Sequence, residues 1–161
     1  MTSLRTAIQS DLKGLKDLFL KSIQQACKND YSPAEIAVWT ATAHNQERWQ
    51  TMLETQYVLV AEIDGRLAGF GTLKGSDYLD FMYVHPDFLR RGVAGKLLQA
   101  LEEKAHMRGS TILVSDISIT ARPFFEKSGF VVLRKNHNER DGEVLVNFRM
   151  EKKLSDKPRK G

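Results

Sequence analysis

The residues around Arg91 combine types and spacing that could bind an anion. An apolar run that starts at Tyr78 leads into the loop Arg90-Arg91-Gly92, and an amphipathic segment follows. We expect a helix to begin directly after this loop. The first backbone N–H groups of a helix lack partners within the helix, and the helix dipole adds positive potential there. Gly92 and Gly95 would let a phosphate approach this backbone closely, so the stretch predicts a site for a phosphorylated ligand.

Two widespread phosphate-binding loops do not fit this stretch. The nucleoside-triphosphate loop needs Gly-x4-Gly-Lys-Ser/Thr, and the dinucleotide loop needs Gly-x-Gly-x-x-Gly, whereas Gly92 and Gly95 are spaced differently. The stretch instead resembles the pyrophosphate loop of the GNAT acetyltransferases, Gln/Arg-x-x-Gly-x-Gly/Ala between a Val-x-Pro strand end and a Leu-Leu helix. The residues in register are Val84-His85-Pro86, Arg91-Gly92-Val93-Ala94 and Leu97-Leu98. A second segment, from Ser118 to Phe130, resembles the family's motif Asn-x-x-Ala-x-x-x-Tyr-x-x-x-Gly-Phe.

The resemblance implies a donor, a reaction and a set of binding residues. The donor would be acetyl-CoA or another acyl-CoA, without a metal. The acceptor would be a primary amine of a small molecule, a peptide or protein N-terminus, or a lysine. The CoA pyrophosphate would lie on the loop backbone, and the pantetheine arm would lie along the preceding strand like an added strand. The residues implied for CoA binding are Met82, Tyr83, Val84, Leu89, Arg90, Arg91, Gly92, Val93, Ala94, Gly95, Ser118, Phe124 and Phe125.

Three positions depart from the family pattern. Leu89 stands where Gln or Arg is usual, and Ser118 stands at the usual asparagine. Phe125 stands at a tyrosine that is commonly assigned as the acid for the leaving thiolate, and it has no ionisable group. A thiol has a pKa of about 8.5, so the thiolate is a fair leaving group without such an acid. A non-catalytic acyl-CoA-binding regulatory module is the alternative function.

Candidates for the base that deprotonates the amine lie on or beside the central strand. Side chains alternate along a strand, which predicts one shared face for Tyr78, Asp80, Met82 and Val84. Asp80 in an apolar strand is the leading catalytic candidate, with a salt bridge as the structural alternative. Tyr78 follows, and its alternative is an ordinary half-buried tyrosine. His85 has a suitable intrinsic pKa, although a histidine before proline is often a loop residue.

The order of expected elements indicates an α/β (α+β) fold. Helices are expected from a cap at Ser10, from Ser32 with Pro33, over 46–54, from Gly92 to Gly109 and over 121–127. Strands are expected at 3–8, 57–63, 66–73, 78–84, 111–115, 130–134 and 144–150. The helix between the strands at 78–84 and 111–115 predicts a central parallel pair in an otherwise mostly antiparallel sheet flanked by helices. In the resembling family this pair is splayed to admit the acyl-CoA.

The segment between the first two strands usually forms the acceptor pocket in the resembling family. Tyr31 and Trp39 lie in this segment and are therefore the candidates for contact with the substrate. Packing in the core is the structural alternative for Trp39. The single cysteine, Cys27, has no evident histidine or aspartate partner, so we expect it to be a small core residue.

Length and charge indicate a single domain at 1–150 followed by a basic, disordered tail at 151–161. The 161 residues carry a formal charge of +4, and the tail, with five basic and two acidic residues, supplies +3 of it. The remaining +1 argues against a nucleic-acid partner. The sequence has no apolar run long enough for a bilayer and no signal-peptide pattern, so we expect a cytoplasmic protein away from membranes. Dimers are common in the resembling family, which leaves a homodimer open.

Overall fold

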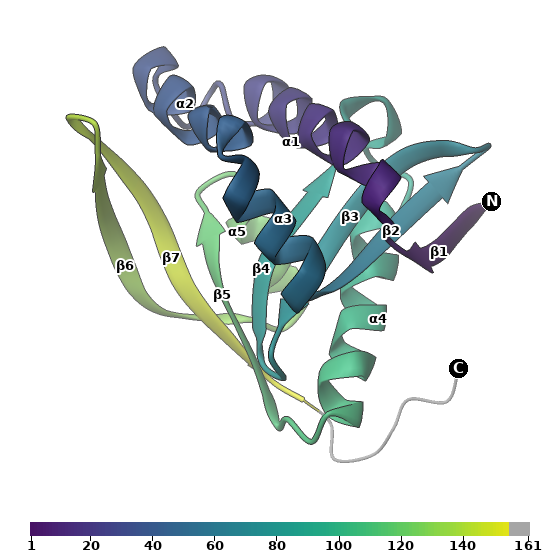
Figure 1. Ribbon diagram of the computed structural model, residues 1–161. Coiled ribbons are helices and arrows are strands. Elements are labelled where there is room, and N and C mark those ends of the chain that lie inside the picture. Colours follow the sequence, from purple (N-terminus) through teal and green to yellow (C-terminus); the bar gives the residue numbers. More distant parts are fainter. Residues whose placement is uncertain (155–161) are drawn as a thin grey trace.

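A seven-stranded mixed sheet forms the centre of the computed structural model, which describes residues 1–154. The spatial order of the strands is β1-β2-β3-β4-β5-β7-β6 (Figure 1). Neighbouring strands are antiparallel except for β4 and β5, which confirms the predicted central parallel pair. The strands are β1 Thr2–Thr6, β2 Tyr57–Ile63, β3 Arg66–Lys74, β4 Tyr78–Val84, β5 Ile112–Ser118, β6 Val131–Arg140 and β7 Glu143–Lys153.

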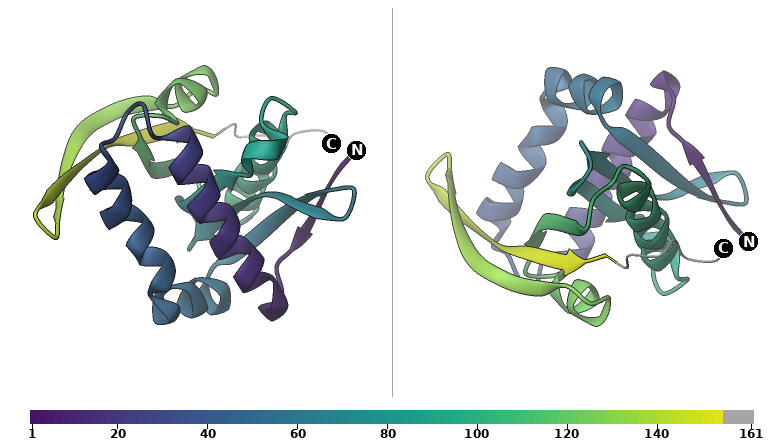
Figure 2. Two further views of the ribbon diagram at one scale, coloured as in Figure 1. Left: turned by 90° about the horizontal axis from the view of Figure 1, so that it is seen from above. Right: turned by 90° about the horizontal axis from the view of Figure 1, so that it is seen from below.

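Helices cover both faces of the sheet (Figures 1 and 2). On one face lie α1 Leu12–Ala26, α2 Pro33–Thr40 and α3 Gln46–Thr55, and on the other lie α4 Val93–Met107 and α5 Arg122–Lys127. Short 3-10 turns precede or join them at η1 Gln9–Asp11, η2 Ala41–His44 and η3 Pro86–Phe88. Each face has its own hydrophobic core. Phe19 and Trp49 belong to the first, and Leu97 and Leu101 to the second.

Helix α4 packs unusually close to β3 because two glycines leave room for it. A Cβ atom at Gly71 would lie 2.6 Å from a methyl carbon of Leu101, and one at Gly69 would lie 2.9 Å from Val93. Such distances are well inside van der Waals contact, so any side chain there would push the helix away. This packing fixes the start of α4 against the end of β4, where the anion loop lies.

The parallel strands β4 and β5 stay together for a short distance and then part. Their register pairs Tyr78 with Val114 and Leu79 with Ser115. Beyond these pairs each strand continues beside its antiparallel neighbour, β3 or β7. The predicted splayed pair is therefore present, and the opening lies at the carboxyl ends of the two strands.

The expectation that four residues of β4 share one face is wrong, because a β-bulge interrupts the alternation. Between the pairs formed by Gly71 and Leu73, two residues of β4 oppose the single residue Thr72. The Thr72 hydroxyl accepts the hydrogen bond of the Phe81 N–H group at 3.0 Å. Before the bulge, Leu79 faces the α4 core. After it, Met82 and Val84 face that core, whereas Phe81 and Tyr83 face α1 and α3.

Several expected boundaries also differ. Ser10 does not cap the first helix; it lies in a 3-10 turn, and Asp11 accepts the N–H of Ile8 at 2.8 Å. The strands expected at 130–134 and 144–150 form a hairpin around Asp141-Gly142, as expected, but the first of them continues to Arg140, so the connection is a tight turn and not a long loop.

The boundary expected at 150 falls inside a strand. β7 runs to Lys153, and Lys152 forms an ion pair of 2.6 Å with the buried Glu102. Residues 151–153 therefore belong to the folded domain, and the rest of the expected tail, 155–161, lies outside the described residues. Within residues 1–154, no helix has the length and apolar character needed to cross a membrane.

Candidate active site

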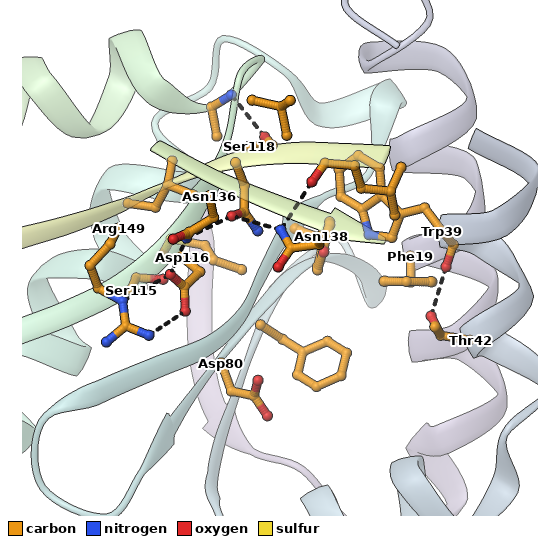
Figure 3. Close-up of a pocket in the computed structure, with 18 of the residues that line it drawn as sticks. Phe19, Trp39, Thr42, Asp80, Ser115, Asp116, Ser118, Asn136, Asn138 and Arg149 are labelled. Carbon is orange, nitrogen blue, oxygen red and sulfur yellow. Dashed lines mark hydrogen bonds and ion pairs between the residues drawn. The ribbon is translucent and has the colours of Figure 1, made fainter. Parts of the chain in front are cut away.

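A cleft of about 400 Å³ lies where β4 and β5 part. Side chains from α1, α2 and α3 line one wall, and side chains from β6 and β7 line the opposite wall. Tyr78, Asp80 and Met82 of β4, together with Ser115 and Asp116 of β5, line the cleft between these walls. Figure 3 shows how these groups gather from elements far apart in the sequence.

Asp116 is the centre of a polar network in the cleft. Its carboxylate accepts two hydrogen bonds of 2.9 Å from Arg149, one of 2.6 Å from the Tyr78 hydroxyl and one of 2.8 Å from Asn136. Burial alone would raise the pKa of Asp116, but the hydrogen bonds from Arg149 and Tyr78 outweigh it and hold this pKa below its ordinary value. Asp116 is therefore a firmly ionised anchor with little capacity to accept a proton at neutral pH.

The network continues along β6 and β7 as a ladder of amides. Asn147 accepts hydrogen bonds from Asn136 at 2.9 Å and from Asn138 at 3.1 Å, and Asn138 also donates to the carbonyl of Leu145 at 3.0 Å. Arg134 donates to Asn136 at 3.1 Å. Arg134, Asn136, Asn138 and Arg140 line the cleft at every second position of β6. The sequence prediction missed this wall, because residues 134–140 are all polar and show no alternation of apolar and polar residues that would indicate a strand.

Asp80 lies in the cleft and is held by two side chains of the α3 region. Arg48 donates to both carboxylate oxygens at 2.8 and 2.9 Å, and Gln56 donates to Oδ2 at 2.6 Å. The Arg48 guanidinium also lies over the Phe81 ring, 4.7 Å from its centroid. The salt bridge that was the structural alternative for Asp80 is thus present. Oδ1 accepts one hydrogen bond and retains a lone pair for a substrate.

The two tyrosines of β4 both line the cleft but have different partners. The Tyr78 hydroxyl donates a hydrogen bond to Asp116, and burial together with this hydrogen bond raises the pKa of Tyr78 well above the ordinary value. Tyr83 packs against Phe19 and Phe70, and burial raises its pKa as well. Neither hydroxyl gives up a proton readily near neutral pH.

The predicted anion loop has a backbone suited to binding. Arg90 and Gly92 both have left-handed backbones, with φ of 63° and 74°, and α4 begins at the next residue. Leu89 is 51% exposed, so the loop does not use it for packing. The Arg91 guanidinium lies 5.6 Å from the Phe88 ring centroid. A Cβ atom at Gly95 would meet no atom within 4 Å, which leaves open space beside the first turn of α4.

His85 stands at the end of β4, outside the lining of the cleft. Its Nδ1 atom accepts the N–H of Asp87 at 3.0 Å and so caps the 3-10 turn η3. Burial lowers the pKa of His85, and the nearby Asp87 partly opposes this effect. The geometry matches the loop role that was the alternative for this residue.

The second motif forms the floor of the cleft near α5. The Ser118 hydroxyl accepts the N–H of Ala121 at 3.1 Å and so orders the start of α5. Phe125 is buried, lines the cleft and packs edge-on against Phe124 and Phe130 with centroid distances of 5.2 and 5.1 Å. An apolar ring therefore occupies the position of the family's usual tyrosine.

The candidate substrate residues have a clear structural role. The Tyr31 hydroxyl donates to the carbonyl of Val146 and accepts the N–H of Ile119 at 3.0 Å. Burial raises the pKa of Tyr31 to about 12. Trp39 packs edge-on against Tyr31, and both rings line the cleft. Cys27 is buried beside them, and burial raises the pKa of its thiol, which matches its expected place in the core.

The fold, the anion loop and the second motif together indicate one class of protein, and comparison with known protein families identifies the same class. Residues 27–153 match the sequence profile described as an acetyltransferase (GNAT) domain. This segment covers most of the chain and includes the anion loop, the parting strands and the second motif. The chain therefore belongs to the GNAT acetyltransferase family.

Individual relatives agree with this assignment. The chain is 32% identical over 147 residues to a protein of Escherichia coli named as the uncharacterized N-acetyltransferase YafP, which covers 91% of this chain and 93% of the relative. A crystal structure of a GCN5-related N-acetyltransferase from Rhodopseudomonas palustris is 36% identical with a TM-score of 0.92, over 96% of both chains. PaiA N-acetyltransferase from Thermoplasma acidophilum, solved in complex with coenzyme A, has the same fold at 22% identity, with a TM-score of 0.78 over 96% of this chain and 99% of PaiA.

Proposed function

We propose that this protein transfers an acetyl group from acetyl-CoA directly to a primary amine. The observation that carries the proposal is the parting of β4 and β5 beside a loop with two left-handed residues at the start of α4. Family membership and the coenzyme A complex of PaiA support the same donor. Within residues 1–154, no group of three or more His, Cys, Asp or Glu side chains is arranged to hold a metal ion.

The residues present fit a bound acyl-CoA. The left-handed Gly92 and the open space at Gly95 would let the pyrophosphate contact the N–H groups between Arg91 and Gly95. Arg90 and Arg91 are exposed and would add positive charge beside the phosphates. Met82 and Val84, after the bulge, would offer backbone groups to the amides of the pantetheine arm.

Acetyl-CoA, when bound, supplies the acetyl group as a thioester. The amine nitrogen forms a bond to the acetyl carbon, the carbon–sulfur bond breaks, and the sulfur leaves with the electron pair as a thiolate. Asp80 would attract the protonated amine and take one proton from it at Oδ1, while Arg48 and Gln56 hold the carboxylate in place. Asp80 would pass this proton to water, and the second proton, which the nitrogen loses once it has bonded to the acetyl carbon, would leave to water by the same route. Tyr78 keeps its proton and donates it in a hydrogen bond to Asp116. Its role would therefore be to hold Asp116 in place, and it would not act as the acid.

A second candidate function is a non-catalytic acyl-CoA-binding module that regulates another protein. Two observations favour it. Phe125 provides no acid, and both carboxylates of the cleft are already engaged by arginines. The two functions share the CoA site and differ in turnover, so one experiment separates them.

The experiment measures thiol release and CoA binding on the same protein. Purified protein is mixed with acetyl-CoA and a panel of primary amines, and CoA binding is followed by the rise in melting temperature. Under the enzyme proposal, at least one amine accelerates thiol release. Asp80→Asn lowers kcat about 10²- to 10⁴-fold, while the CoA-induced rise in melting temperature remains. Asp77→Asn, an exposed change next to the start of β4, is the matched control and keeps full activity.

Two outcomes would count against the enzyme proposal. Tight CoA binding with no amine-dependent thiol release across a broad panel would favour the regulatory module. Full activity of Asp80→Asn would remove Asp80 from the proposed chemistry and leave the donor assignment intact.

A further inference from the structure

The cleft has more positive than negative side chains. Its charged lining consists of four arginines and two aspartates, which leaves a surplus of two positive charges. Arg48 is committed to Asp80, and Arg149 is committed to Asp116, each through two hydrogen bonds. The surplus belongs to the two other arginines, Arg134 and Arg140, which both lie on β6.

Arg134 occupies an electrostatically unfavourable position. In the sheet register, Asp116 of β5 pairs with Arg149 of β7, and Arg149 pairs with Arg134 of β6. Two arginines therefore stand directly opposite each other, and the one aspartate in the row already binds Arg149. Like charges at opposed positions of a sheet destabilise it. A further anion next to Arg134 would relieve this repulsion.

Arg134 is exposed, and one hydrogen bond orients its guanidinium. Its Nε atom donates to Asn136, which is tied to Asp116 and Asn147 by its own amide. The two terminal nitrogens of the Arg134 guanidinium have no protein partner within residues 1–154. A guanidinium fixed at one nitrogen and open at the others is suited to the two oxygens of a carboxylate or to a phosphate.

Arg140 lies two steps further along the same wall, beyond Asn138. It stands opposite Glu143 in the register, yet no ion pair joins the two within the described part of the chain, and Arg140 lines the cleft whereas Glu143 does not. Arg134 and Arg140 thus flank the amide ladder at its two ends. Asn138 Oδ1 and the Asn147 amide nitrogen have no protein partner within residues 1–154, so the ladder also offers an acceptor and a donor.

The CoA phosphates do not account for these arginines. In the proposed function the pyrophosphate lies on the loop before α4, and none of residues 85–95 lines this cleft. The arginines belong instead to β6, in the wall of the cleft opposite the side chains from α2 and α3. Figure 2 shows the β6–β7 hairpin beside these helices. The ligand they serve enters from the acceptor side.

Resting on the proposed function, we propose that the acceptor is a small amine that also carries an oxyanion, a carboxylate or a phosphate. Its anion would bind Arg134 and Arg140 on β6, and its amine would lie toward Asp80 of β4. A cleft of about 400 Å³ is in the range of small-molecule sites. The positive charge of Arg134 and Arg140 on one wall and the carboxylate of Asp80 between the walls would orient such a zwitterion with its amine toward the parting strands.

The test compares amines that differ in the anion alone. Amino acids are paired with their carboxamides, and O-phosphoethanolamine is paired with ethanolamine, with thiol release from acetyl-CoA as the readout. We expect at least one anionic member to have a kcat/KM about tenfold or more above its neutral partner. The two kinds of pair show whether the carboxylate or the phosphate is preferred.

Variants then locate the anion site. Arg134→Gln and Arg140→Gln should each raise KM and lower kcat/KM for the anionic amine about ten- to hundredfold. Both variants should leave the neutral partner and the CoA-induced rise in melting temperature unchanged. Lys135→Gln is the matched control, because it removes a positive charge from an exposed position of β6 that does not line the cleft.

A binding measurement separates this inference from the proposed function. The same amine pairs are titrated calorimetrically into the protein saturated with CoA. Preference for the anionic members without any turnover would support the anion site and overturn the enzyme proposal. Turnover of neutral and anionic amines at equal rates would overturn the anion site alone, as would an equal loss in Lys135→Gln. Neither binding nor turnover of any amine would overturn both.

Discussion

Tyr78 of β4 donates a hydrogen bond of 2.6 Å to Asp116 of β5 at the point where these two strands part. On β5 this bond lies one residue beyond Ser115, the last residue of that strand that pairs with β4. Because Asp116 is also bound by Arg149 and Asn136, it connects β4 to β6 and β7 at the closed end of the cleft. The opening at the carboxyl ends of β4 and β5 is therefore anchored by side chains as well as by the sheet.

Tyr78→Phe removes this bond and keeps the ring. We expect the free energy of unfolding to fall by about 1 kcal/mol, because one buried hydrogen bond to a charged acceptor is lost while Arg149 and Asn136 still hold Asp116. Urea unfolding followed by circular dichroism measures the change. Tyr57→Phe is the control, since the Tyr57 ring packs under Lys104 at 4.8 Å and its hydroxyl has no hydrogen bond within residues 1–154. An equal loss in both variants would contradict the prediction.

Asp116→Asn should change how stability depends on acid pH. The folded protein holds the pKa of Asp116 below the unfolded value of 3.8, so the unfolded state binds more protons as the pH falls through this range. The contribution of Asp116 is therefore complete above about pH 5 and is lost progressively as the pH falls below the unfolded pKa. We expect Asp116→Asn to be less stable than wild type at pH 7 by about 1–2 kcal/mol, and the gap to narrow by pH 3. Urea unfolding at several pH values gives both quantities, and a gap that widened in acid would refute the prediction.

Gly92→Glu should abolish CoA binding and leave the fold intact. Gly92 has φ of 74°, which costs a non-glycine residue about 1–2 kcal/mol, and the new carboxylate would repel the phosphates from the loop. The test is the rise in melting temperature on adding CoA. Gly65→Glu is a matched control, because Gly65 also has a left-handed backbone, φ of 75°, and open space around it, but it lies in the β2–β3 turn. The control should show the same backbone cost and a normal response to CoA.

Phe125→Tyr restores the residue type that is usual in the family. If the thiolate leaves without a dedicated acid, as proposed, kcat should change by no more than about threefold, since a thiol with a pKa of about 8.5 is already a fair leaving group. The Phe125 ring lies in an apolar cluster with Phe124 and Phe130, so the added hydroxyl should cost stability of about 1–3 kcal/mol. Steady-state kinetics and thermal melting test the two parts separately. A large rise in kcat would indicate that the acid had been missing.

The sequence predicted the parts of the fold that depend on local chemistry. The cap formed by Ser32 is present as expected, with its hydroxyl accepting the N–H of Glu35 at 3.1 Å. The parallel pair was predictable, because a helix between two strands forces a crossover. The loop at Gly92 and the helix that begins directly after it were predictable, because glycine residues between an apolar run and an amphipathic segment favour a turn into a helix N-terminus.

The cleft wall on β6 and β7 was not predicted, for a physical reason. A long hairpin with a polar face lacks the apolar alternation from which strands are recognised, so residues 135–143 were expected to be loop. The partners of Asp80 were equally hidden, because Arg48 and Gln56 are 32 and 24 residues away in the chain. These hydrogen bonds depend on how α3 packs over β4, and a local sequence pattern does not encode this packing.

Because of the bulge opposite Thr72, the directions of the side chains of β4 depend on the exact number of residues in this strand. Asp80, one of the two bulged residues, reaches Arg48 of α3, whereas Met82 and Val84, which follow the bulge, pack toward α4. One inserted backbone residue thus lets a single strand direct the carboxylate of Asp80 into the cleft and the side chains of Met82 and Val84 toward the α4 core. Deleting one residue of the bulge would exchange the two orientations over half of the strand. We therefore infer that the number of residues between Asp80 and Met82 matters to the site as much as the identity of these two residues.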